Sequence, residues 1–181
     1  MSSLIKFNVA YIKLCTKTEG PFKRCCIWFQ GCNLNCKGCC NKDLQALIPN
    51  HILSFDKLVD IVKEAKEKYG IEGITLSGGE PSLQKGLADF NDAVHSLGLG
   101  VIMFSGKPKE MLNPDLIRSV DLLIDGPFIE SELDTDRVLL GSKNKNLTYI
   151  TSRYESEAGY FNNPISIEEI TAEDYIFING D

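Results

Sequence analysis

No apolar run in this sequence approaches the roughly 20 residues that a membrane-spanning helix needs. Residues 1–6 lack the apolar core and cleavage site of a signal peptide, and the chain has no internal repeat, low-complexity tract or linker. Basic residues number 19 against 25 acidic ones, and this net charge of −6 disfavours nucleic acid as the main partner. We therefore expect a cytoplasmic protein with neither a membrane nor a nucleic acid as its partner.

The cysteines cannot all be paired with one another, because the chain has seven of them. In a reducing compartment such thiols serve as metal or redox ligands more often than as disulfides. Cys32, Cys36 and Cys39 stand in the spacing C-x3-C-x2-C. Three thiols this close together suit one centre of a soft metal, which is zinc, copper(I) or an iron–sulfur cluster.

A structural zinc site usually takes four protein ligands in closely spaced pairs, whereas this chain has one group of three and no second cysteine group. A four-iron cluster with one iron left open for another ligand fits the triplet better. The alternative is a zinc-binding interaction module without catalysis. Its site needs a fourth thiol, and the candidates are Cys15, Cys25, Cys26 and Cys40.

Apolar segments bounded by turn residues alternate with amphipathic segments along the chain. The segments that predict strands are 4–14, 25–29, 71–76, 99–104, 120–124, 147–151 and 175–178. Helices are expected between the N-cap Ser54 and Gly70, over 83–97 and briefly over 108–118, whereas 41–53 is expected to be irregular. Such alternation predicts an α/β protein with a parallel sheet.

The length of the chain sets the expected size of this sheet. A closed eight-stranded barrel takes about 250 residues, so 181 residues predict an open partial (β/α) barrel of about six parallel strands. We expect residues 1–181 to form a single domain, with a core over about 5–150 and an extension over about 151–181.

Four polar or glycine-bearing motifs each follow a predicted strand. They are the cysteine triplet, Ser77-Gly78-Gly79-Glu80-Pro81, Ser105-Gly106 and Asp125-Gly126. Because the carboxyl ends of parallel strands share one edge, these motifs are expected to converge there. Glycines allow the backbone to approach a ligand closely. Taken singly, the last three motifs are also compatible with ordinary turns that end a strand.

The cysteine triplet, followed after one helix by the Ser77–Pro81 motif at the end of a strand, resembles the radical S-adenosylmethionine (SAM) superfamily. Further segments are similar to the small activating enzymes of anaerobic ribonucleotide reductase, and the resemblance covers about residues 5–150. These segments are Thr18-Glu19-Gly20-Pro21 with Arg24, Trp28-Phe29-Gln30-Gly31-Cys32, Gly38-Cys39-Cys40-Asn41, Asp125-Gly126-Pro127-Phe128 and Gly141-Ser142-Lys143-Asn144. The chain departs from this subgroup at Cys40, where an aromatic residue is frequent, and at 33–35, where a histidine is common.

This resemblance implies that Cys32, Cys36 and Cys39 hold three irons of one 4Fe-4S cluster, and that SAM binds the fourth iron. Cys40 is the alternative third ligand, in the spacing C-x3-C-x3-C. Reduction of the cluster then splits SAM into methionine and a 5′-deoxyadenosyl radical, which abstracts hydrogen. The residues expected around SAM, because they lie in the glycine-rich turn or at the same rim as the cluster, are Gly38, Cys40, Ser77, Gly78, Gly79, Glu80, Ser105 and Asp125.

The activity implied by the resemblance is that of an oxidoreductase that installs a glycyl radical on a large partner enzyme. Its electron donor is expected to be a flavodoxin- or ferredoxin-type protein. The alternative is a small radical SAM enzyme that modifies a peptide or a small molecule. The acidic segment 129–136 is interpreted as a solvated loop, or else as a partner surface or a lid.

Overall fold

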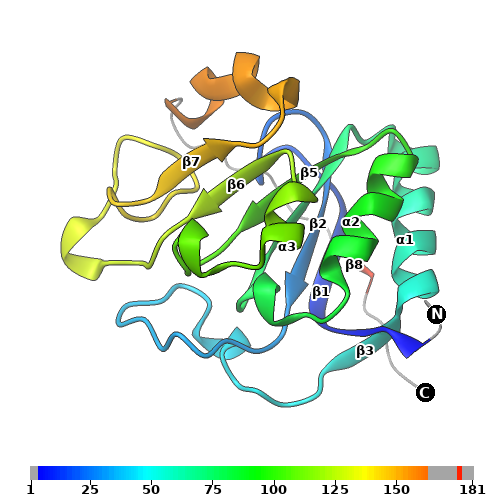
Figure 1. Ribbon diagram of the computed structural model, residues 1–181, viewed down its shortest axis with the longest axis horizontal. Helices are drawn as coiled ribbons and strands as arrows, with labels where there is room; N and C mark the ends of the chain where they lie inside the picture. Colours follow the sequence, from blue (N-terminus) through cyan, green and yellow to red (C-terminus); the bar gives the residue numbers. More distant parts are fainter. Residues whose placement is uncertain (1–3, 163–174, 177–181) are drawn as a thin grey trace.

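The computed structural model describes residues 4–162 and 175–176, and its strands form one open, mixed sheet (Figure 1). β2 (Arg24–Phe29), β4 (Gly73–Gly78), β5 (Gly100–Phe104) and β6 (Leu122–Asp125) lie parallel to one another in the middle of the sheet. Antiparallel strands flank them. These are β1 (Lys6–Thr16) beside β2, β3 (His51–Ser54) and β8 (Tyr175–Ile176) beside β1, and β7 (Asn146–Tyr149) beside β6.

The α/β class is confirmed, but the expectation of about six parallel strands is wrong, because among the described strands only these four are parallel. Parallel neighbours need a crossover of a dozen or more residues. The turn over 17–23 is too short for one, so β1 and β2 form an antiparallel pair. The connection over 126–145 is longer but contains no α-helix, and it returns the chain antiparallel to β6.

Three α-helices lie along the sheet, namely α1 (Phe55–Tyr69), α2 (Leu87–Ser96) and α3 (Pro114–Arg118) (Figure 1). The predicted boundaries of α1 are confirmed, since the Ser54 hydroxyl accepts a hydrogen bond from Lys57 N and Gly70 ends the helix at φ 62°. The 3-10 helices are η2 (Lys42–Leu44), η3 (Pro81–Leu83), η4 (Lys109–Met111), η5 (Glu130–Glu132) and η6 (Ser152–Asn162). None of the described helices is long and apolar enough to cross a membrane.

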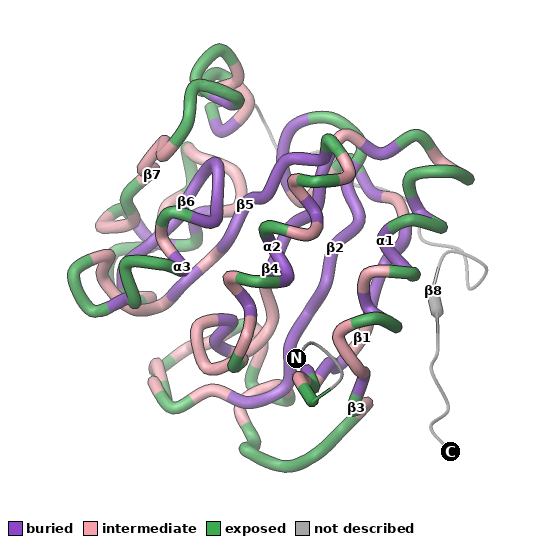
Figure 2. Tube along the Cα trace, turned by 45° about the vertical axis from the view of Figure 1, so that its right-hand side comes forward, coloured by how far each residue is buried: buried purple, intermediate pink, exposed green. Residues whose placement is uncertain are grey.

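The central strands are buried on both faces, and alternate residues supply two cores (Figure 2). Val101 and Met103 of β5 belong to the larger core, to which α1 and α2 also contribute. Ile102 joins the smaller core, whose other buried members are Leu122, Ile124, Leu140, Tyr154 and Phe161. The loop before β7 and η6 therefore cover the sheet face that the α-helices leave free.

Arg24 and Tyr154 close the amino end of the parallel strands. The fully buried guanidinium of Arg24 donates to the Tyr154 hydroxyl at 2.9 Å and to Glu72 Oε2 at 3.2 Å. A Cβ on Gly100 would lie 2.1 Å from the Tyr154 hydroxyl, so the tyrosine packs directly against the backbone of this glycine. With this end closed, the opposite, carboxyl end is left for function.

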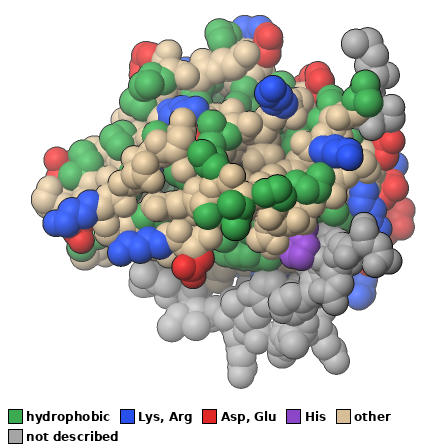
Figure 3. Space-filling view, turned by 90° about the horizontal axis from the view of Figure 1, so that it is seen from below, with side chains coloured by type: hydrophobic (Ala, Val, Ile, Leu, Met, Phe, Trp, Pro, Cys, Tyr) green, Lys and Arg blue, Asp and Glu red, His purple; other side chains and the backbone are tan. Residues whose placement is uncertain are grey.

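The carboxyl end of β2 leads into the cysteine loop, which we define as residues 30–41 and which lies at the bottom of Figure 1. The part predicted to be irregular follows it, but it ends in a strand, β3, that the sequence did not indicate. Figure 3 looks onto this end of the molecule and shows hydrophobic side chains, a class that includes cysteine, across the middle of the face.

Candidate functional site

The cysteine loop and the turn that follows β4 are joined by backbone hydrogen bonds. Gly79 N donates to Phe29 O at 2.8 Å, and Glu80 N donates to Gly31 O at 2.9 Å. β2 and β4 are parallel neighbours in register from Arg24 and Gly73 to Phe29 and Gly78, which brings both strand ends to the same level. The two motifs that the sequence analysis singled out therefore form one continuous wall.

Two of the glycines in this wall have no room for a side chain. A Cβ on Gly79 would lie 2.2 Å from Gly31 O, and a Cβ on Gly78 would lie 2.4 Å from Phe29 N. Gly78 also has φ 103°, a conformation that other residues rarely adopt. Asn41 fixes the same turn from the far side of the cysteine loop, because its Nδ2 donates to Gly78 O at 3.2 Å.

Glu80 is fully buried and is held by the end of β5. Its Oε1 accepts from the Ser105 hydroxyl at 2.9 Å and from Ser82 N at 3.1 Å, while its Oε2 accepts from Gly106 N at 2.8 Å. Ser105 therefore contacts this carboxylate directly. Three hydrogen bonds hold the buried carboxylate in one orientation.

Leu34 connects the cysteine loop to the same strand end. A Cβ on Gly106 would lie 2.3 Å from Leu34 Cδ1, so Gly106 leaves the space that this side chain needs. The sequence does not predict this contact, since an apolar residue between two asparagines carries no signal of its partner. The carboxyl ends of β2, β4 and β5 thus meet around the cysteine loop, as predicted.

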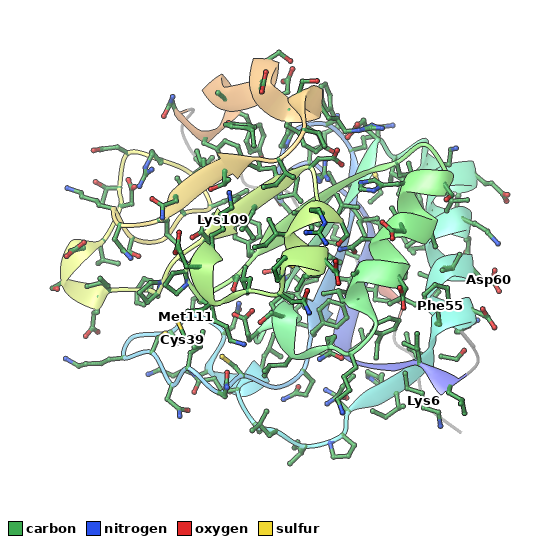
Figure 4. All side chains as sticks on the ribbon, viewed as in Figure 1. Lys6, Cys39, Phe55, Asp60, Lys109 and Met111 are labelled. Atoms are coloured by element: carbon green, nitrogen blue, oxygen red, sulfur yellow. The ribbon has the colours of Figure 1, made fainter. Side chains whose placement is uncertain are left out.

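Cys32, Cys36 and Cys39 are partly exposed on the cysteine loop, where Figure 4 labels Cys39. A hydrogen bond from Cys39 N to Cys36 O at 3.3 Å turns the chain between the second and third thiols, and Cys32 N donates to Gln45 O at 3.0 Å. Burial is the largest cause that raises the pKa of the Cys32 thiol, and the negative charge of Glu80 acts in the same direction.

Within residues 4–162, no three His, Cys, Asp or Glu side chains are grouped as the ligands of a single metal ion. A four-iron cluster makes a different demand, because each thiolate binds a different iron and the sulfurs surround a larger body.

The remaining cysteines differ sharply in environment. Cys25 and Cys26 are fully buried in β2, and burial raises the pKa of Cys25 to about 12, so it is a small apolar core residue. Cys40 is exposed and lies next to Cys39. Cys15 is partly buried and packs against the larger core. Of these four, only Cys40 lies in the cysteine loop.

Asp125 and Gly38 occupy the far side of this end of the sheet. Asp125, at the end of β6, is buried and accepts from Lys109 N at 2.9 Å and from the Thr148 hydroxyl at 3.4 Å. Gly38 has φ 74°, and a Cβ there would lie 2.8 Å from Glu130 Oε1. Ser77, next to the end of β4, pairs in register with Trp28 of β2.

The acidic segment 129–136 contacts the cysteine loop. Lys37 Nζ and Glu130 Oε2 form an ion pair at 3.0 Å between two exposed side chains. From the sequence this segment is a solvated loop, a partner surface or a lid, and the structure places Glu130 against Lys37 and Gly38, between the second and third thiols of the triplet.

Lys145 lies at this end of the sheet, and the sequence did not predict its position there. Its Nζ donates to Ser105 O at 3.3 Å and to Gly126 O at 2.5 Å, the carbonyl oxygens of the residues that directly follow β5 and β6. A lysine in a polar loop gives no local signal of such a position. The amide oxygen of Asn144, one residue earlier, is buried without a hydrogen-bond partner among the described residues.

Comparison with known protein families identifies the class. The family model described as a 4Fe-4S single cluster domain matches residues 18–148, which span the cysteine loop and all four parallel strands. The chain therefore belongs to the 4Fe-4S single cluster domain family.

Sequence comparison finds activating proteins among the relatives of this chain. The chain is 28% identical over 138 residues to the anaerobic ribonucleoside-triphosphate reductase-activating protein of Escherichia coli K12, covering 70% of this chain and 88% of the relative. It is 24% identical over 146 residues to the protein of the same name from Enterobacteria phage T4, covering 77% and 92%. These relatives confirm the resemblance to small activating enzymes.

Two further similarities concern another activating enzyme and a solved structure. The pyruvate formate-lyase-activating enzyme of Streptococcus mutans is 30% identical over 155 residues, which cover 78% of this chain and 57% of that protein. Among solved structures, QueE from Escherichia coli superposes over 67% of this chain and 70% of its own, with a TM-score of 0.45 and 12% identity.

Proposed function

We propose that this chain is a radical SAM activase that installs a glycyl radical on a larger partner enzyme. One observation carries the proposal. Glu80 N and Gly79 N are hydrogen-bonded to the residues that lead into the cysteine triplet, so a cluster held by the thiols and a ligand held by the Ser77–Glu80 turn lie side by side.

The residues present fit a 4Fe-4S cluster and SAM. Three partly exposed thiols share one loop at the carboxyl end of the sheet and would hold the cluster there. The glycines remove the side chains that would fill this space. The buried, unpartnered amide oxygen of Asn144 is a polar group that a bound ligand can satisfy.

In this proposal Cys32, Cys36 and Cys39 hold three irons, and SAM occupies the fourth. When bound and reduced, the cluster supplies the electron that splits SAM into methionine and a 5′-deoxyadenosyl radical, which abstracts a hydrogen atom. The chain supplies position and electrostatics. Backbone groups of Ser77, Gly78 and Gly79 and the Glu80 carboxylate bind the ammonium group of SAM.

Ser105 acts through Glu80, because its hydroxyl donates to that carboxylate and holds it in place. Three further residues of the proposed SAM site lie on the side of β6 and the acidic segment, namely Asp125, Gly38 and Cys40. We assign them to the remaining polar groups of SAM, with Gly38 and Cys40 contributing mainly backbone atoms. The cysteine thiols must ionise on ligation, and binding of iron supplies the driving force for that ionisation.

The partner is a large glycyl-radical enzyme, which the names of the relatives support. The hydrogen atom comes from the Cα of a glycine on a loop of that partner, and a flavodoxin- or ferredoxin-type protein delivers the electron. The open sheet suits a polypeptide substrate, because the thiols lie on an exposed loop at one end of the molecule.

Anaerobic reconstitution with iron and sulfide, followed by reductant and SAM, tests the first half of this function. We expect 5′-deoxyadenosine from the wild-type chain and none from Cys36→Ala, while Cys15→Ala, a matched control outside the cysteine loop, retains the activity. An intact cluster that yields no 5′-deoxyadenosine would contradict radical SAM chemistry.

Addition of the anaerobic ribonucleotide reductase of the same organism tests the second half. We expect a glycyl-radical doublet in the EPR spectrum of the reductase. Production of 5′-deoxyadenosine without any radical on the reductase would favour the alternative, a radical SAM enzyme acting on a peptide or a small molecule.

A further inference from the structure

Lys145 connects the ends of β5 and β6 to the start of β7 at the carboxyl end of the parallel strands. It directly precedes β7, and because β7 runs antiparallel to β6, its first residues lie beside the last residues of β6. The ammonium group donates to Ser105 O and Gly126 O. An ammonium group has three N–H donors, so these two bonds leave one for a further acceptor.

The groups around this ammonium group are carboxylates, which carry a negative charge, and thiols, which acquire one when they bind a metal. The groups that act on it electrostatically are Glu80 from the turn after β4, Asp125 from β6, and Cys36 and Cys40 from the cysteine loop. Burial is the largest influence and lowers the pKa of Lys145, whereas all four of these groups oppose that change. Ser105, whose carbonyl oxygen accepts from Lys145, is followed by Gly106, and Leu34 of the cysteine loop packs against Gly106. Lys145 therefore places a positive charge at the end of the sheet that carries the cysteine loop.

A positive charge at this place favours the reduced form of a cluster. One-electron reduction adds one negative charge to the cluster, and the potential of an iron–sulfur cluster depends on the net charge and hydrogen bonds around it. Two unit charges attract each other more strongly in a partly buried site than in water. The ammonium group is also held in place by two carbonyl oxygens, so it does not have to reorganise when the electron arrives.

We propose that Lys145 is a positioning residue that raises the midpoint potential of the cluster by stabilising its reduced form. This inference rests on the proposed function, because it requires the cluster at Cys32, Cys36 and Cys39. It concerns electron uptake alone, and so it is independent of which molecule donates the hydrogen atom.

The test compares three variants of the reconstituted full-length chain by EPR-monitored redox titration without any partner enzyme. Lys145→Met removes the charge and keeps an unbranched side chain, Lys145→Arg keeps the charge, and Lys143→Met removes the charge of an exposed lysine on the same loop. We expect a more negative midpoint potential in Lys145→Met, and potentials close to wild type in Lys145→Arg and Lys143→Met.

Iron and sulfide content and thermal unfolding accompany each titration. A Lys145→Met variant with a full cluster and the wild-type potential overturns the proposal, and so does an equal shift in Lys143→Met. If Lys145→Met fails to hold a cluster, the result for Lys145→Arg decides between a role of the charge and a purely structural role. A loaded Lys145→Arg with the wild-type potential supports the role of the charge, whereas loss of the cluster in both variants shows a purely structural role and overturns the proposal.

A titration that succeeds in a protein lacking activase activity leaves this inference standing and removes only the assignment of a glycyl-radical partner. A protein that never forms a four-iron cluster removes the proposed function itself. The two failures are therefore distinguishable.

Discussion

Glu80 donates its backbone N–H to the carbonyl oxygen of Gly31, and the two residues lie at the ends of neighbouring parallel strands. This one bond joins the loop that carries the thiols to the turn that carries the buried carboxylate. The geometry of the site therefore depends on the pairing of β2 with β4. A change in the backbone of the cysteine loop or of the turn after β4 is expected to displace the other.

Gly79→Ala is expected to break this connection. The new methyl group would lie 2.2 Å from Gly31 O, and such overpacking typically costs about 1–3 kcal/mol. Urea unfolding should show that loss, and iron content after reconstitution should fall with it. Gly159→Ala is the matched control, because a Cβ there meets nothing within 4 Å. Equal stability of the two variants would show that the wall can relax around the methyl group.

The assignment of Cys39 rather than Cys40 as the third ligand can be decided by two alanine variants. We expect Cys39→Ala to lose the four-iron cluster and its 5′-deoxyadenosine production, and Cys40→Ala to keep both, since the Cys36–Cys39 turn is closed by a backbone hydrogen bond. Iron and sulfide analysis with the visible absorption spectrum gives the readout. The reverse pattern would move the ligand to Cys40 and the spacing to C-x3-C-x3-C.

Glu80→Gln is expected to weaken SAM binding while leaving the cluster in place. Hydrogen bonds to a charged group contribute about 1.5–3 kcal/mol, which corresponds to a loss of affinity of about 10- to 100-fold. Ser105→Ala removes one neutral partner of this carboxylate, so its effect should be smaller, about fivefold. Calorimetric titration of the loaded protein with SAM measures both. Wild-type affinity in Glu80→Gln would remove Glu80 from the SAM site.

Asp121 is expected to make folding sensitive to acid. It accepts hydrogen bonds from His95 at 3.0 Å, Thr151 at 2.6 Å and Val101 N at 2.8 Å. Burial raises the pKa of this carboxyl group, but the hydrogen bonds outweigh burial and lower it to about 2. An unfolded aspartate has a pKa of about 3.9. The ionised form therefore contributes about 2 kcal/mol of stability above pH 4, and this contribution is lost as the pH falls from about 4 to about 2.

The free energy of unfolding in urea, measured between pH 2 and pH 7, checks the role of Asp121. Asp121→Asn should be less stable than wild type at neutral pH, and the difference should shrink toward pH 2. Parallel pH profiles for the two proteins would mean that other carboxyl groups account for the acid sensitivity.

The local signals in the sequence predicted the elements that short-range chemistry specifies. Ser54 and Gly70 mark both ends of α1 because an N-cap hydroxyl and a left-handed glycine act on adjacent backbone. The convergence of the strand-end motifs followed from the rule for parallel strands, and the contacts around Gly31, Glu80 and Gly106 bear it out.

Features that depend on distant partners could not be predicted in this way. β3 is a strand of four residues whose pairing with Lys6–Val9 of β1 gives it its structure. The direction of β7 depends on how the loop over 126–145 folds back, and the hydrophobic periodicity of the sequence does not predict the path of that loop. Lys145 belongs to the site only because that return places it against the carbonyls of Ser105 and Gly126.

The contact between Arg24 and Tyr154 bridges 130 residues of sequence, and it has a consequence for the order in which the protein matures. A ribosome releases Arg24 long before Tyr154 is made. Until then the guanidinium lacks the hydroxyl that helps to compensate its burial, and an incompletely paired buried charge is costly. A nascent chain therefore cannot pair this guanidinium fully, and so cannot complete the packing at the amino end of its sheet, until η6 has been synthesised.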